Sequence, residues 1–204
     1  MAVDKKFRHV TTPMEEPYPN NLEDPNADGD FKSACNMWVG KLLYLSRMTR
    51  ADLATAVGRL SRYMHKWNKY ADHSLHRLMQ YIDHHQDYQL VFTIEVGKRY
   101  VLRLYVDADH AGDISTSKST TGAVLYIASE DESTWCPIIW WSKRQGATAW
   151  SSGEAELVAL SEAVRPAIKL QLLSSAISGR EMPMQVRDDS SACIGAVRKR
   201  YSEI

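Results

Sequence analysis

The chain has 204 residues, of which 44% are hydrophobic, so it is long enough for one ordinary domain or two small ones with a buried core. Its 25 Lys and Arg residues balance 25 Asp and Glu residues. This zero net charge excludes the global positive field that marks many nucleic-acid-binding proteins. Any contact with nucleic acid must therefore come from a local patch.

Cysteine usage and hydropathy indicate a protein that is neither secreted nor membrane-bound. Cys35, Cys136 and Cys193 are too few for a disulfide framework, and none belongs to a CxxC pair. The N-terminal MAVDKKFRHV lacks the apolar core of a signal peptide, and no stretch approaches the ~18–20 apolar residues that cross a bilayer. We expect a soluble intracellular protein, cytoplasmic or nuclear, with no membrane partner. The seven histidines have no ligand spacing, so we expect no zinc site.

The first part of the chain is expected to be an irregular strap followed by helices. Residues 13–31 carry four prolines and many Asn and Asp residues, which favour turns, and they predict a strap over 1–32. Apolar residues at helical spacing then predict two or three helices over 33–87. Thr49-x-x-Asp52 has the pattern of a capping box. The residues that define the apolar stripes are Leu53, Ala56, Val57, Leu60, Met64, Leu75, Leu78, Met79 and Ile82.

Residues 88–204 are expected to form a mixed α/β domain. The segments YQLVFTI and YVLRLYVD, separated by EVGKR, predict a hairpin, and TGAVLYIAS and PIIWWSKR extend it into an antiparallel meander over 88–144. Ser151-x-x-Glu154 then predicts a capped helix, which Pro166 is expected to kink or break. A short strand in MPMQVR is predicted to run into a helix that starts near Asp189 or Ser190.

Three carboxylates lie at the ends of predicted elements. Asp107 ends a strand, Glu156 lies in the first turns of a helix, and Asp188 ends another strand. Clustered carboxylates repel one another unless a cation neutralises them, and such oxygen ligands suit Mg²⁺ or Mn²⁺. Two ions at such a site serve phosphodiester hydrolysis. Alternatively, the aspartates are turn formers and the glutamate a favourable charge near a helix N-terminus. Spacing alone leaves both interpretations open.

Several blocks of the sequence resemble one family. YVDADHAGD, KSTTGAVLYI, WWSKRQGATAWSSGEAELVALSEA and VRDDSSA resemble, in order and spacing, the ribonuclease H domain of Ty1/copia-type retrotransposon polyproteins. That family shows SDADWAGD-like, KSTSGY, WxSKKQ, SSTEAEY and CDNxSA-like segments. Upstream, VGKLLYLSRMTRADLATAVGRLSRYMHKW resembles the segment that connects reverse transcriptase to ribonuclease H.

The resemblance implies a fold and an activity. The fold is α/β and ribonuclease H-like: a helical connection segment over 33–87, then, over 88–204, three antiparallel strands and one parallel strand flanked by helices. The activity is metal-dependent hydrolysis of the RNA strand of RNA/DNA hybrids during reverse transcription. Asp107, Glu156 and Asp188 correspond to the catalytic residues that hold two Mg²⁺ or Mn²⁺ ions. The partners implied are the hybrid and the remaining reverse transcriptase portion of the polyprotein.

Contacts with the nucleic acid are expected from a small local patch. Lys143 and Arg144, in the SKRQ block, are suited to phosphate contacts, and we expect Ser119, in the KSTTG block, to contribute. Arg187, directly before Asp188, could pair with a carboxylate and lower its pKa.

The resemblance also implies elements that follow Asp188. A complete domain of this family has a further strand, a further helix and a fourth acidic ligand there, whereas this sequence ends at VRKRYSEI. We therefore expect a C-terminally incomplete domain. The alternative to an active ribonuclease H is a truncated, catalytically incomplete retroelement remnant that acts at most as a nucleic-acid or protein binding module.

Overall fold

Apolar side chains at helical spacing build the first of two units into which the chain divides, Met1–Leu90 and Val91–Ile204. The computed structural model describes residues 9–15, 24–113 and 116–202. Residues 1–8 and 16–23 of the expected strap lie outside the described residues. The expected boundaries after residues 32 and 87 stay predictions. In the described ranges, no helix is both long and apolar enough to span a bilayer.

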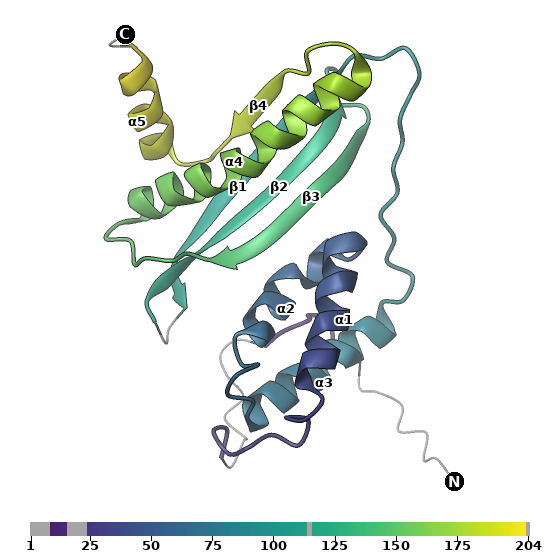
Figure 1. Ribbon diagram of the computed structural model, residues 1–204, viewed down its shortest axis with the longest axis vertical. Coiled ribbons are helices and arrows are strands. Elements are labelled where there is room, and N and C mark those ends of the chain that lie inside the picture. The colour runs from purple at the N-terminus through teal and green to yellow at the C-terminus, as the bar shows by residue number, and fades with distance from the viewer. Residues whose placement is uncertain (1–8, 16–23, 114–115, 203–204) are drawn as a thin grey trace. The chain divides into compact units, whose positions relative to one another are not determined.

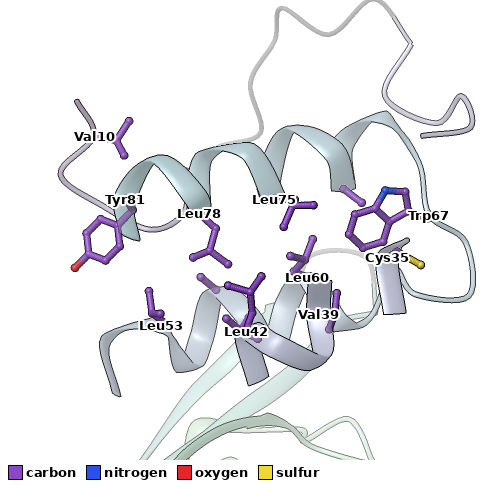
Figure 2. Packing of buried hydrophobic residues seen from close by; sticks show 13 residues of the cluster. Val10, Cys35, Val39, Leu42, Leu53, Leu60, Trp67, Leu75, Leu78 and Tyr81 are labelled. Atoms are coloured by element: carbon purple, nitrogen blue, oxygen red, sulfur yellow. The ribbon is translucent and has the colours of Figure 1, made fainter. Parts of the chain in front are cut away.

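The first unit is helical, and its core lies between the helices (Figure 2). Trp67 is buried in this core, and its indole Nε1 donates to Oδ1 of Asp72 at 2.6 Å, so the burial leaves no polar atom of the ring unsatisfied. The helices are α1 (Cys35–Met48), α2 (Ala54–Ser61), which follows a 3₁₀ turn at Ala51–Leu53, and α3 (Lys69–His84).

The expected capping box at Thr49 is wrong. Thr49 is the C-cap of α1, and no side-chain cap precedes the 3₁₀ turn. The carboxylate of Asp52 instead accepts from Nη2 of Arg50 at 2.8 Å. Arg50 is buried, and a buried positive charge without a partner is strongly destabilising. The Asp52 carboxylate therefore pairs with Arg50 and does not cap the helix start.

The second unit is a mixed sheet with a long helix on one face (Figure 1). The strand order is β3-β2-β1-β4, in which β1 and β2, and β2 and β3, pair antiparallel, while β4 pairs parallel to β1. The expected class, mixed α/β with helices first, three antiparallel strands and one parallel strand, is confirmed. The elements are β1 (Tyr100–Asp113), β2 (Lys118–Ser129), β3 (Trp135–Arg144), α4 (Ser152–Ser178), β4 (Met184–Arg187) and α5 (Ser191–Ser202).

Small residues on α4 let the helix pack closely on the sheet. Its buried face is made of alanines at helical spacing, which meet large aliphatic side chains of β1 and β2. Of the kink or break expected at Pro166, the break does not occur: the helix continues through this residue, and Ala163 and Ala167 on either side of it pack against the sheet. The buried residues of this cluster are Leu102, Leu104, Val106, Ala123, Leu125, Ala159, Ala163 and Ala167.

The expected strand over YQLVFTI is also wrong. Residues 88–94 have no regular secondary structure, and their large side chains Val91, Phe92 and Ile94 are exposed. A turn does form at Gly97, whose φ of 92° suits glycine, but in the described part of the chain the residues before it pair with no strand. β propensity alone therefore did not make a hairpin here.

The packing predicts a large stability difference between two leucines. We expect Leu104→Ala, at a fully buried position in β1, to lower the free energy of unfolding by about 2–5 kcal/mol, because it leaves a cavity against α4. The matched control Leu172→Ala, on the exposed side of α4, should change it by less than about 0.5 kcal/mol. Urea unfolding followed by circular dichroism measures both, and equal losses would contradict this packing.

Candidate metal centre

Acidic side chains gather where the pairing of β1 with β4 ends. Contrary to the expectation from the sequence, Asp107 does not end its strand, because β1 runs on to Asp113 beside β2. The parallel pairing of these strands finishes at Tyr105 opposite Arg187. Asp107 follows two residues later in β1, and Asp188 and Asp189 come directly after β4. Because β1 and β4 run in the same direction, the residues that directly follow the end of their pairing lie near one another, so these three aspartates lie at the same edge of the sheet.

The start of α4 brings a glutamate to this edge. The predicted cap is present: Oγ of Ser151 accepts from the backbone N–H of Glu154 at 3.2 Å, and Oε2 of Glu154 accepts from the N–H of Trp150 at 2.7 Å. Glu154 is thereby committed to the helix end, whereas Glu156, two residues later, is buried against the strand ends.

A buried glutamine fixes the helix start to the sheet. Gln145 is 2% exposed, and its Nε2 donates to Oγ1 of Thr121 at 3.2 Å and to the carbonyl of Ala155 at 2.8 Å. It thereby ties the end of β3 to β2 and to the residue next to Glu156. Sequence analysis gave Gln145 no role, although its place in the WxSKKQ-like block was an available signal.

Three carboxylates converge at this edge. One oxygen from each of Asp107, Glu156 and Asp189 lies within 4.8 Å of the other two. Glu156 is 7% exposed, and its Oε2 is buried without a hydrogen-bond partner among the described residues. An unpaired buried carboxylate oxygen costs free energy that a bound cation would recover. Hard oxygen donors at this separation fit Mg²⁺ or Mn²⁺.

The proximity of these charges changes the protonation of Glu156. Burial, followed by the negative charges of Asp188 and Asp107, raises the pKa of Glu156 from its ordinary 4.5 to about 7, and Asp189 adds to the shift. The backbone N–H of Ala108 opposes it. Without a cation, Glu156 therefore holds a proton over much of the range below neutral pH.

Asp188, expected as a ligand, lies beside the cluster, and one of its two carboxylate oxygens already accepts a hydrogen bond from the backbone. Its Oδ1 accepts from the N–H of Ser190 at 2.8 Å, while its Oδ2 is buried and is another acceptor for which the described residues provide no hydrogen bond. Burial, followed by a hydrogen bond of its thiol with the Asp188 side chain and by the negative charges of Asp188 and Glu156, raises the pKa of Cys193 to about 11. The catalytic role of Asp188 stays a prediction, and Asp189 is a member of the cluster that sequence analysis missed.

The residues expected to contact nucleic acid lie in different environments. Lys143 is exposed, whereas Nη1 of Arg144 forms an ion pair with Oδ2 of Asp113 at 2.8 Å. Ser119 is fully buried, and its hydroxyl accepts from the N–H of Ala111 at 3.2 Å, which supports the last part of β1, where the pairing with β2 shifts register. The roles of all three in binding stay predictions.

Arg187 does not pair with the clustered carboxylates. Its Nη2 lies 3.0 Å from Oε1 of Glu132, and its guanidinium lies over the ring of Tyr105. The strand residue next to Asp188 therefore leaves the negative charge of the cluster unneutralised.

The shifted pKa predicts how stability changes with pH in metal-free protein. Between pH 4.5 and about 7 the folded chain keeps a proton on Glu156 that the unfolded chain releases, so the free energy of unfolding falls as pH rises. At about 1.4 kcal/mol per pKa unit, the loss is on the order of 3 kcal/mol by pH 8. Glu156→Gln should remove this loss and be more stable than wild type at pH 8, measured by denaturant unfolding in EDTA.

Comparing the two proteins at each pH cancels the titration of groups that do not interact with Glu156. Equal pH dependence in wild type and Glu156→Gln would show that Glu156 titrates normally. Adding Mg²⁺ at pH 8 should stabilise wild type more than the variant, because only wild type then offers the third carboxylate.

Known proteins resemble this chain over much of its length, although no family model matches it. It is 36% identical over 141 residues to secreted RxLR effector protein 161 of Plasmopara viticola. The aligned residues are 69% of this chain and 94% of that protein. It is 38% and 36% identical to the retrovirus-related Pol polyproteins from transposons RE2 and RE1 of Arabidopsis thaliana, over 58% and 72% of this chain.

The chain spans a small part of these polyproteins, 8% of the RE2 protein and 9% of the RE1 protein. One relative is named as secreted and the others as polyproteins, so the expected intracellular location stays a prediction. Several retrotransposon Pol polyproteins match the chain at 31–38% identity, and these matches give the family. The chain belongs to the Pol polyproteins of copia-type retrotransposons.

Proposed function

We propose that the second unit is a ribonuclease H that hydrolyses the RNA strand of RNA/DNA hybrids during reverse transcription, inside the cell. The observation that carries this proposal is the convergence of Asp107, Glu156 and Asp189, where Oε2 of Glu156 is buried and has no hydrogen-bond partner among the described residues. Membership of a retroelement polyprotein family supplies the context in which such hybrids arise. An exposed acidic pair at strand ends alone would not support it, since turns commonly carry aspartates.

Each residue has a separate part in the proposed reaction. Asp107, Glu156 and Asp188 would hold two Mg²⁺ or Mn²⁺ ions; the chemistry that bound ions would supply here is activation of a water and stabilisation of the leaving oxygen of the phosphodiester. Asp107 is exposed, so it meets the substrate side of the centre. Glu156 approaches from α4 and must lose its proton to become a ligand. Gln145 and the cap at Ser151 hold Glu156 in place.

Recognition of the hybrid would rest on its backbone and 2′-hydroxyl groups. Lys143 is exposed and forms no ion pair with any residue that the structure describes, so its charge is available for a phosphate. Trp150 at the head of α4 is 95% exposed and offers a ring on which a base can stack. Arg144 and Ser119 would support this surface through their contacts with Asp113 and Ala111 in the last part of β1. We propose the remaining reverse transcriptase portion of the polyprotein as a second partner.

The proposal predicts metal-dependent cleavage of an RNA strand. The full chain, with a hybrid labelled on its RNA strand, should produce shorter RNA in Mg²⁺ or Mn²⁺ and none in EDTA. Asp107→Asn should abolish the cleavage, because it removes a charged ligand at an exposed site with little change in shape. Gel electrophoresis of the RNA products measures both.

The matched control is Asp109→Asn, which changes the same residue type two positions along β1, outside the carboxylate cluster. It should keep wild-type cleavage. If the wild-type chain is folded and binds the hybrid without cutting it, the ribonuclease activity is contradicted and the chain acts as a binding module.

The exposed lysine predicts a change in salt dependence. Lys143→Ala should weaken hybrid binding equally for different base sequences and should lower the slope of log affinity against log salt by about 1. Fluorescence anisotropy of a labelled hybrid measures this. Lys169→Ala, on an exposed part of α4, is the control. An unchanged slope for Lys143→Ala would remove Lys143 from the interface.

A further inference from the structure

Two adjacent aspartates after β4 have different surroundings. Asp188 directs Oδ1 to the N–H of Ser190, whose own Oγ accepts from the N–H of Cys193 at 3.2 Å, so Asp188 helps to start α5. Asp189 is exposed, and its carboxylate is the one whose oxygen lies within 4.8 Å of oxygens of both Asp107 and Glu156. The turn into α5 thus directs the second aspartate, as well as the first, toward the strand ends.

A separate observation indicates that this cluster receives a ligand. Glu156 is more than nine-tenths buried, and its Oε2 accepts no hydrogen bond from the described residues; the carboxylates of Asp107 and Asp189 near it are themselves acceptors. Buried polar atoms are nearly always paired, so such an exception calls for a partner that is not part of the chain. A divalent cation would coordinate this oxygen and would also neutralise the repulsion between the three carboxylates.

We propose that Asp189 is a metal ligand of this chain, additional to the three carboxylates that the family resemblance assigns. The CDNxSA-like segment of the family has an amide at this position, so a carboxylate directly after Asp188 is a feature of this sequence. It is distinct from the fourth acidic ligand that the family has further along its chain. Its negative charge strengthens the binding of divalent cations, since affinity rises with the number of charged ligands. This inference rests on the proposed metal centre, but it concerns which side chains hold the ion.

Direct metal binding tests the inference without relying on catalysis. Titration of the full chain with Mn²⁺, followed by the electron paramagnetic resonance signal of free Mn²⁺, gives the affinity. Asp189→Asn restores the family's amide and, at an exposed position, leaves the fold intact. We expect it to weaken Mn²⁺ binding by about tenfold or more, since even changes to residues behind the ligands cost about 10- to 100-fold.

Asp109→Asn is the matched control and should bind Mn²⁺ with wild-type affinity. The rise in melting temperature on adding Mg²⁺ should be smaller for Asp189→Asn than for wild type or Asp109→Asn. Unchanged Mn²⁺ affinity in Asp189→Asn would overturn the inference, and so would a wild-type chain that binds no Mn²⁺.

Cleavage of the labelled hybrid, measured in parallel, separates this inference from the proposed function. Weaker Mn²⁺ binding by Asp189→Asn in a wild-type chain that cuts no RNA would support the ligand assignment and contradict the ribonuclease activity. If the wild-type chain cleaves RNA but Asp189→Asn has unchanged Mn²⁺ affinity, the ribonuclease activity would be supported and the assignment of Asp189 as a ligand contradicted.

Discussion

Mutual repulsion between carboxylates at one edge of the sheet is the constraint on which the second unit depends. Asp107, Glu156 and Asp189 come from three different elements, and none would stay close to the others without a rigid support. Three features provide it: the parallel pairing of β1 with β4, the alanine face of α4 on the sheet, and the hydrogen bonds of Gln145. The elevated pKa of Glu156 is the cost of that arrangement in the absence of a cation.

The sequence contained most of the second unit because its strands and its long helix have strong local signals. β-branched and aromatic runs gave β1, β2 and β3, and the Ser151 cap marked the start of α4. The parallel position of β4 came from the family resemblance, since periodicity cannot give strand order. Where local preference misled, tertiary surroundings decided. Residues 88–94 have β propensity but pair with no strand among the described residues, and α4 continues through Pro166 with Ala163 and Ala167 packed on the sheet.

The candidate site was less predictable than the fold. The family pattern identifies the acidic block after β4, but which of two adjacent aspartates faces Glu156 depends on the turn that Asp188 makes with Ser190. That turn depends on where α5 begins, and spacing alone gave its start only to within a residue or two. Gln145 is a similar case, because its function follows from hydrogen bonds between elements rather than from a chemistry of its own.

Anomalous X-ray diffraction from crystals of the chain soaked in Mn²⁺ tests most directly whether these carboxylates form a metal centre. The predicted result is an anomalous peak bounded by Asp107, Glu156 and the Asp188–Asp189 pair, with Oε2 of Glu156 among its ligands. An ordered carboxylate cluster with no peak, or with Oε2 of Glu156 hydrogen-bonded to a protein donor instead, would contradict it.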